Sequence, residues 1–136
     1  MKNSKIYMTT FVIILFAGFC SCNSTSSNTP GMAVTSLYEK MKNNEFDKVA
    51  KMYVTKDGKQ LSNDETKKLE GMVGMGAKEF DKKGGLDKVT INEEKISEDG
   101  NSAQVDFTIH FKNGKTDNEN VSLIKVNGNW VIKIIG

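Results

Sequence analysis

The 136-residue chain carries 19 Lys and no Arg against 17 acidic residues, so its formal net charge is only +2 at pH 7. Lys2 and Lys5 belong to an amino-terminal apolar segment, and without them the positive and negative charges balance. A neutral domain without Arg lacks the electrostatic attraction and the bidentate contacts by which proteins usually bind phosphates. Nucleic acid is therefore not an expected partner, and the length predicts one ordinary domain behind a short leader.

The amino-terminal segment has the pattern of an export signal. Lys2 and Lys5 form a positive region, and an apolar run over residues 11–19 follows them. This run is too short to cross a bilayer as a helix, which distinguishes it from a transmembrane segment. We therefore interpret residues 1–21 as a signal peptide.

The sequence from Phe19 to Cys22 resembles the end of a lipoprotein leader, where an apolar residue and two small residues precede the Cys that receives the lipid. Cys22 fits this position better than Cys20, because Ser21 before Cys22 is small whereas Phe19 before Cys20 is bulky. The alternative is a disulfide or a metal pair, but these two Cys are the only ones in the chain and they end an apolar leader. Cys22 is the predicted lipid-attachment residue.

Residues 22–29 are predicted to be the acylated Cys and a flexible tether, because the stretch is short, polar and without periodicity. Seven extended residues span at most about 25 Å, which keeps the domain close to a membrane. Bacteroidetes-type lipoproteins that reach the outside of the cell usually carry acidic residues just after the Cys, and none occurs here before Glu39. By this resemblance we expect an outer membrane lipoprotein that faces the periplasm.

Residues 30–136 are predicted to form a single domain that begins with two helices. Thr29 is a candidate N-cap, Pro30 suits the first helical position, and Asn43 and Asn44 interrupt the apolar run. A second helix is expected over residues 45–53. The apolar stripes are Val34, Leu37, Tyr38 and Met41 in the first helix, and Phe46, Val49, Ala50 and Tyr53 in the second.

A third helix is predicted after a loop over residues 55–61. Ser62 and Glu65 form a capping-box pattern, in which each side chain accepts a hydrogen bond from the backbone N–H of the other residue. A Gly inside a helix costs roughly 1 kcal/mol relative to Ala, and three occur here, so we expect a weak or broken middle. The three are Gly71, Gly74 and Gly76, and the expected apolar stripe is Leu69, Met72, Val73, Gly76 and Phe80.

From Leu86 onward the apolar periodicity changes to two, which indicates strands. Three dipeptides typical of tight hairpin turns then follow at equal spacing, and they divide the segment into four long antiparallel strands. These turns are Asp99-Gly100, Asn113-Gly114 and Asn127-Gly128. The predicted class is α+β, with N-terminal helices packed on a curved four-stranded antiparallel sheet.

The apolar residues of neighbouring strands do not fall on one face if every turn has two residues. Such a turn at Asn113-Gly114 pairs Phe107 with Asn120 and puts Val121 on the opposite face. A two-residue turn at Asp99-Gly100 would likewise put the apolar residues of the first two strands on opposite faces. We therefore predict a bulge or an odd-length loop at one of the first two turns. At Asn127-Gly128 the ideal register already matches Leu123 with Ile132, so the third hairpin should be regular.

The order of the elements resembles that of a known protein family. The features that carry this likeness are the Asn-Asn-Glu-Phe-Asp break at residues 43–47 and the Asn-Gly-Asn-Trp-Val-Ile-Lys-Ile ending at residues 127–134. They resemble uncharacterised bacterial lipoproteins of the Bacteroidetes type, labelled lumazine-binding-like, within the cone-shaped nuclear-transport-factor-two-like superfamily. This superfamily includes isomerases, dehydratases and non-catalytic binding modules, so the resemblance implies a fold and not an activity.

A catalytic interpretation would rest on the polar side of the second predicted strand, where Asp106, Thr108 and His110 alternate. An Asp and a His on one face can share a proton, as general acid–base catalysis requires. The simpler interpretation is that these residues form the solvent side of an amphipathic strand. Phe107 and Ile109 would then face the helices, and His110 would face away from them.

Met72 and Met75 allow two functional interpretations besides simple packing. Paired thioethers can bind Cu(I), but a Met at helical spacing is far more often core filler, and we expect no metal and no cofactor. The same two residues could instead line an adaptable apolar pocket. The predicted pocket residues are Tyr38, Tyr53, Met72, Met75, Phe80, Phe107 and Trp130.

Two functions of different classes remain open at this point. The favoured one is a non-catalytic cell-envelope lipoprotein that binds a small apolar ligand or an envelope protein, as a monomer or a dimer. The alternative is a cone-fold isomerase or hydrolase that uses Asp106 and His110. A titratable group held inside the cone would favour the enzyme.

Overall fold

The computed structural model describes residues 29–134. The signal peptide, the lipid-attachment residue Cys22 and most of the tether therefore lie outside the described residues. None of the helices within 29–134 is both long enough and apolar enough to cross a membrane.

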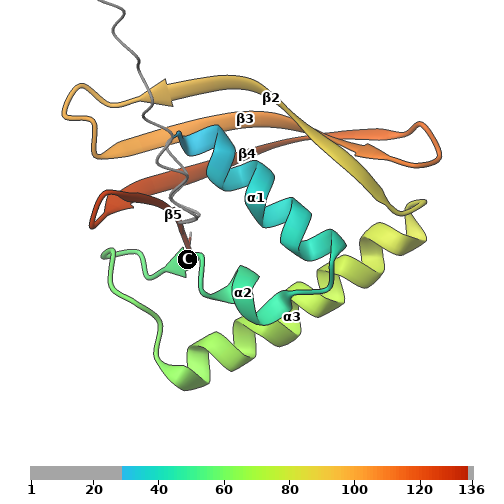
Figure 1. Cartoon of the computed structure of the whole chain (residues 1–136), viewed down its shortest axis with the longest axis horizontal. Helices are drawn as coiled ribbons and strands as arrows, with labels where there is room; N and C mark the ends of the chain where they lie inside the picture. Colours follow the sequence, from blue (N-terminus) through green and yellow to red (C-terminus); the bar gives the residue numbers. More distant parts are fainter. Residues whose placement is uncertain (1–28, 135–136) are drawn as a thin grey trace, which may run out of the picture.

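The domain has the α+β architecture that the sequence predicts, with helices packed on one face of a curved sheet (Figure 1). Helix α1 lies across the sheet, and α3 packs chiefly against α2. The strand order is β1-β5-β4-β3-β2. The elements are α1 (Pro30–Lys42), α2 (Phe46–Ala50), β1 (Tyr53–Val54), α3 (Asn63–Lys82), β2 (Leu86–Ile96), β3 (Ser102–Phe111), β4 (Thr116–Val126) and β5 (Asn129–Lys133).

The sheet has five strands, and the prediction of four omitted the short strand β1. This strand runs parallel to β5, with Tyr53 opposite Ile132. The backbone N–H of Ile132 donates to the C=O of Met52 at 2.9 Å, and that of Ile134 donates to the C=O of Val54 at 3.0 Å. Helix α2 ends at Ala50 and does not reach Tyr53, because the chain after the helix pairs with β5 as strand β1.

Both predicted helix starts are confirmed. The Thr29 hydroxyl accepts from the Met32 N–H at 3.2 Å, and Ser62 and Glu65 form a complete capping box. The start of α1 has a second partner, because the carboxylate of Glu94 in β2 accepts from the Gly31 N–H. A side chain at position 31 would collide with that carboxylate, so the contact requires Gly.

Helix α3 is continuous over its whole length, which corrects the expectation that its glycines would break it. Leu69, Val73 and Phe80 hold the helix on the core at both sides of the glycine-rich turn. At its end the Lys83 ammonium contacts the Asp117 carboxylate of β4 at 2.6 Å. Tertiary packing therefore outweighs the low helix propensity of Gly in this segment.

The register of the second and third hairpins agrees with the prediction. The β3–β4 loop has an odd length, because Phe111 pairs with Lys115 across residues 112–114. Val105 then stands opposite Val121, and both face the core side. The β4–β5 hairpin is regular, with Leu123 opposite Ile132.

The first hairpin reaches the same result by a bulge that lies inside β2, away from the turn. Pairing slips by one residue at Asn92, so Ile91 stands opposite Phe107 while Glu93 stands opposite Asp106. Without this slip, Ile91 would fall on the solvent side of the sheet.

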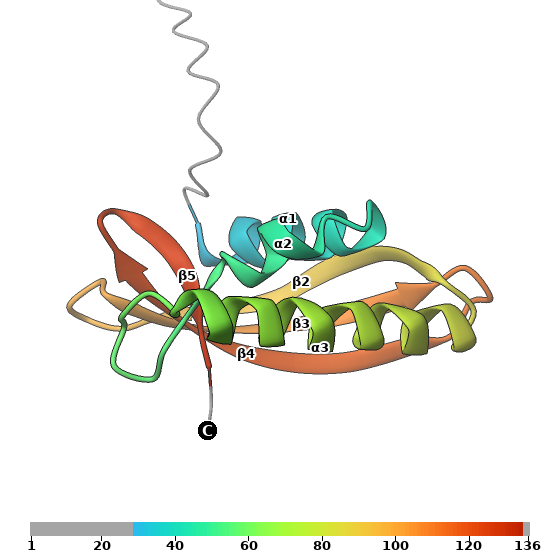
Figure 2. The same cartoon turned by 90° about the horizontal axis from the view of Figure 1, so that it is seen from below.

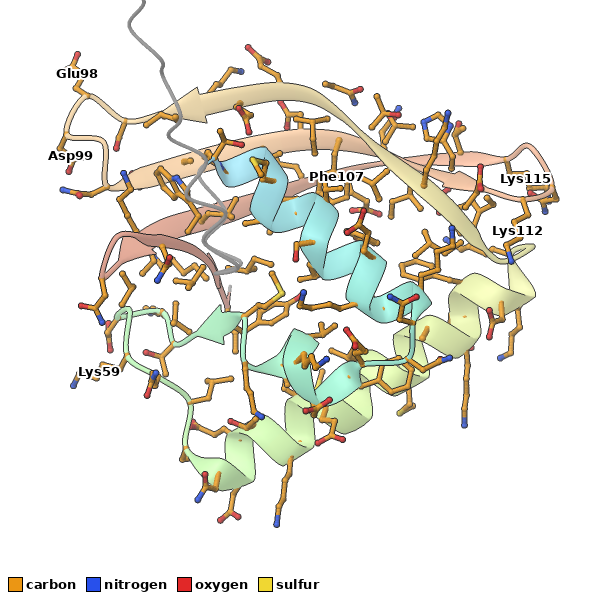
Figure 3. The ribbon with its side chains drawn as sticks, viewed as in Figure 1. Lys59, Glu98, Asp99, Phe107, Lys112 and Lys115 are labelled. Atoms are coloured by element: carbon orange, nitrogen blue, oxygen red, sulfur yellow. The ribbon has the colours of Figure 1, made fainter. Side chains whose placement is uncertain are left out.

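The core fills the space between α1 and the inner face of the sheet (Figure 3). Strand β3 contributes its whole apolar side, and Phe107 is only 3% exposed. The expected assignment of the two faces is confirmed, since His110 lies on the opposite side of the same strand. The buried residues of β3 are Ala103, Val105, Phe107, Ile109 and Phe111.

These positions predict a large difference between two alanine substitutions in one strand. Phe107→Ala should destabilise the domain by about 3 to 5 kcal/mol, because it removes a buried aromatic side chain. His110→Ala should change stability by less than about 0.5 kcal/mol, because that side chain makes one exposed hydrogen bond, to Thr90. Chemical denaturation of both variants measures the difference, and a large loss from His110→Ala would contradict the assignment of the faces.

Candidate functional site

One cavity is lined by four buried core residues, Val34, Leu37, Phe107 and Ile132, and it is the candidate functional site. Its volume is about 120 Å³, and we call it the Tyr38 cavity. Two wider hollows, of about 340 and 410 Å³, include only one and two buried core residues respectively. The Tyr38 cavity is lined by Val34, Leu37, Tyr38, Tyr53, Phe107, Glu119, Asn120, Val121 and Ile132.

Five elements contribute residues to this cavity: α1, β1, β3, β4 and β5. The cavity is open because β5 pairs with only the last part of β4. Strand β5 pairs only with Leu123–Val126 at the end of β4, and its other side pairs with β1. The first half of β4 is therefore an edge, and Glu119 stands on its inner face opposite Phe107. Helix α1 covers the apolar part of the cavity, while the exposed Glu119 lies at its mouth.

Two half-buried tyrosines, Tyr38 and Tyr53, contribute polar groups to the wall of the cavity. The pKa of Tyr38 is raised well above its ordinary value, first by burial and then by the proximity of Tyr53 and Glu119. Burial also raises the pKa of Tyr53. Both side chains therefore remain protonated over the physiological range, and each can donate a hydrogen bond to a guest molecule.

An aromatic cluster fixes the position of Tyr38. The ring centroid of Tyr38 lies 5.4 Å from that of Phe107 and 6.1 Å from that of Phe80. Phe80 in turn lies 5.9 Å from Phe111. These tilted arrangements are favourable for aromatic pairs, so the wall of the cavity is preformed by α1, α3 and β3.

Three of the seven predicted pocket residues, Tyr38, Tyr53 and Phe107, line the cavity together. Phe80 lies behind Tyr38 and supports it without lining this space. Trp130 is buried elsewhere, under the ammonium of Lys125 at 5.1 Å from the ring centroid.

The assignment of Met72 and Met75 to the pocket was wrong. These side chains are 59% and 69% exposed on the outer side of α3, far from any apolar enclosure. The true apolar stripe of the helix runs through Leu69, Val73 and Phe80. Met72 is one residue from Val73 and is thus rotated by about 100° around the helix.

Sequence reasoning missed Glu119 at the mouth of the cavity. It stands within a polar run of β4, and no periodic signal distinguishes it from its neighbours. Only the three-residue β3–β4 loop brings it to the inner face. A correct register for that loop could have placed it, since Glu119 then pairs with Phe107.

The residues of the enzymatic alternative lie on the outer face of the sheet, away from the Tyr38 cavity. Asp106 accepts a hydrogen bond from the Asn120 amide. His110 shares one with the Thr90 hydroxyl at 2.9 Å. The Thr108 hydroxyl between them accepts from Asn92 and donates to Asn118, both at 2.8 Å. Asp106 and His110 thus have separate partners and no hydrogen bond to each other.

The acidic side chains and His110 are dispersed over the domain. Within residues 29–134 no three His, Cys, Asp or Glu side chains come together in a grouping that could hold a metal ion. The polar side chains that can face the cavity are those of Tyr38, Tyr53 and Glu119, because the Asn120 amide donates to Asp106 on the outer face.

Two solved structures are similar to this one in fold. A Campylobacter jejuni protein described as an NTF2-like transpeptidase aligns with a TM-score of 0.64 at 20% identity, over 79% of this chain and 99% of its own. A SEC-C motif-containing protein from Rhodopseudomonas palustris aligns with a TM-score of 0.54 at 12% identity, over 80% of this chain and 78% of its own. At such identities the likeness shows the nuclear-transport-factor-two-like fold alone.

No curated protein matches the sequence. These comparisons leave the lipoprotein and lumazine-binding labels untested. A family match, by contrast, covers residues 21–133 and so nearly the whole domain. The chain belongs to the family described as "Domain of unknown function (DUF4878)".

Proposed function

We propose that this protein is a non-catalytic lipoprotein of the cell envelope that binds a small, mostly apolar molecule in the Tyr38 cavity. The observation that supports this proposal is the combination of an apolar wall with two half-buried tyrosines that remain protonated. Apolar pockets with a few polar groups are the usual form of small-molecule sites.

The size of the cavity limits the ligand. A dry protein cavity of about 150 Å³ can hold benzene, so the 120 Å³ of the Tyr38 cavity suits a single ring or a short branched chain. The hydroxyls of Tyr38 and Tyr53 favour a ligand with one hydrogen-bond acceptor. The Glu119 carboxylate at the mouth favours a donor on the part of the ligand nearest to solvent.

The absence of catalysis is part of the proposal and rests on where the titratable groups lie. A general acid or base must be held within reach of the bound substrate. Tyr38 and Tyr53 keep their protons, and Glu119 is solvent-exposed at the mouth, so no carboxyl or imidazole group is enclosed in the cavity. The isomerase or hydrolase alternative would need Asp106 and His110, which face away from the cavity.

The lipoprotein part of the proposal rests on the leader and on the tether length. Pro30 is already the buried first residue of α1, so the polar segment between Cys22 and Thr29 is the whole tether. Its reach of about 25 Å would keep the domain next to the membrane. We place it on the periplasmic side of the outer membrane, because no acidic residue follows Cys22 closely.

The anchor predicts a specific response to substitution of one cysteine. Cells that express the full chain should incorporate labelled palmitate into the protein, and Cys22→Ser should abolish the labelling because it removes the acceptor thiol. The matched control is Cys20→Ser, which should leave labelling and membrane fractionation unchanged. Labelling that depends on Cys20 would show that the attachment residue is wrongly assigned.

The cavity predicts that a small aromatic probe stabilises the domain. Phenol at millimolar concentration should raise the melting temperature, because a ligand that binds only the folded state shifts the unfolding equilibrium. Val121→Phe should remove this response, since the larger side chain fills the cavity. Val126→Phe is the matched control on the same strand, outside the cavity, and it should respond like the natural protein. Equal stabilisation of all three proteins would refute binding in the Tyr38 cavity.

The partly buried tyrosines predict a loss of stability at alkaline pH. The folded pKa of Tyr38 is above the unfolded value of about 10, so its contribution is fully present below pH 10 and is lost as the pH rises through the folded pKa. Tyr38→Phe should therefore flatten the decline in stability above pH 10. The ionisation of Tyr38 can be measured by absorbance at 295 nm in the chain without its leader. Phenolate from Tyr38 that forms near pH 10 in the folded protein would contradict the burial of this group.

A further inference from the structure

Helix α3 exposes two large apolar side chains on its outer face. Met72 and Met75 are 59% and 69% exposed, and no neighbouring element of the described domain covers them. Figure 2 shows α3 in front of the sheet, with no other element covering the side of the helix that faces the viewer. Such side chains on one helix face are a feature of surfaces that bind another protein.

The same face carries a glycine that the fold itself does not require. A side chain built at Gly71 would meet no atom within 4 Å, and its φ is helical, whereas Gly74 on the inner side lies against Phe46. Gly in a helix interior costs roughly 1 kcal/mol relative to Ala, and no intramolecular contact offsets this cost at Gly71. Because Gly71 has no side chain, the helix backbone is accessible at this point of the outer face, and another helix can approach it closely.

Charged residues on this face are arranged so that the helix is complementary to itself. Asp64, Lys68, Met72, Met75, Glu79 and Lys82 follow one another at steps of three or four residues and so share one stripe. If a second α3 lies antiparallel, Lys68 meets the partner's Glu79 and Asp64 meets the partner's Lys82. The two Met residues then meet at the two-fold axis.

A parallel arrangement would have the opposite effect, because each charged residue would meet its own copy. Within residues 29–134 neither Asp64 nor Lys68 has an ion-pair partner, so both are available for intermolecular contacts. Glu79 pairs with Lys82 of the same helix at 2.6 Å, with both side chains exposed, and this pair can extend into a network with the partner's charges.

We propose that α3 binds the α3 of a second copy of this chain in an antiparallel, two-fold symmetric pair, with Met72 against the partner's Met75. This inference goes beyond the proposed function and does not depend on the Tyr38 cavity. Stable interfaces bury about 800 Å² on each partner, and one helix pair offers less, so the dimer is weak and its population rises with concentration.

Engineered cysteines test the geometry directly, using the chain from residue 23 onward, which contains the whole described domain and no cysteine. A mixture of Lys68→Cys and Glu79→Cys proteins should form a mixed disulfide under mild oxidation. Lys68→Cys alone should not crosslink, because a rise of 1.5 Å per residue separates position 68 from its own copy by about 16 Å. Ile96→Cys, at an exposed position of β2, is the control for random collision.

Sedimentation equilibrium tests the charges independently of cysteine chemistry. Lys68→Glu should weaken dimerisation at least tenfold, because the changed side chain meets the partner's Glu79. The double variant Lys68→Glu/Glu79→Lys should restore it, because opposite charges meet again. A monomer at all concentrations, or crosslinking of Lys68→Cys alone as efficient as that of the mixture, would overturn the proposal. So would failure of the double variant to recover dimerisation.

Discussion

The core of this domain depends on an extra residue in the middle of β2, at Asn92, and a second slip in this strand lies between Leu86 and Lys88. Side chains alternate across a strand, so an uninterrupted β2 would turn Val89 and Ile91 away from the residues that they must pack against. The bulge at Asn92 restores the match, and Ile91 then stands opposite Phe107. The amide of Asn92 is itself held by the Thr108 hydroxyl at 2.8 Å, on the outer face. The polar network outside thus stabilises the distortion that the apolar core needs.

This division into two faces determines where chemistry could occur. Everything apolar in β3 faces α1, and everything titratable in β3 faces solvent, where Asn and Thr neighbours already occupy its hydrogen bonds. A catalytic pocket needs both kinds of group in one space. They approach one another at the unpaired edge of β4, where Glu119 and Tyr38 line the same cavity. The small cavity at that point is accordingly the place where ligand specificity could change.

Local signals predicted the starts of α1 and α3 and all three turns, since Thr29, Ser62, the Asp-Gly dipeptide and the two Asn-Gly dipeptides act through their own backbone. Features set by distant partners were harder to predict. Strand β1 exists only as a neighbour of β5, and the alternation of side chains predicted a bulge or an odd-length loop at one of the first two turns without locating the slip at Asn92. Only part of the Tyr38 cavity could be predicted, for the same reason. Tyr38 and Phe107 have periodic signals, whereas Glu119 reaches the cavity through register alone.

The contact between Gly31 and Glu94 has a mechanical consequence. The first helical turn of α1 is held to β2 by this hydrogen bond, at the point where the amino-terminal segment enters the fold. A pulling force applied through that segment therefore acts first on the Glu94 carboxylate and then, through β2, along the long β2–β3 ladder. Strands loaded along their length must break many hydrogen bonds together, so the domain should resist tension from its amino end better than from the short β5 at its carboxyl end.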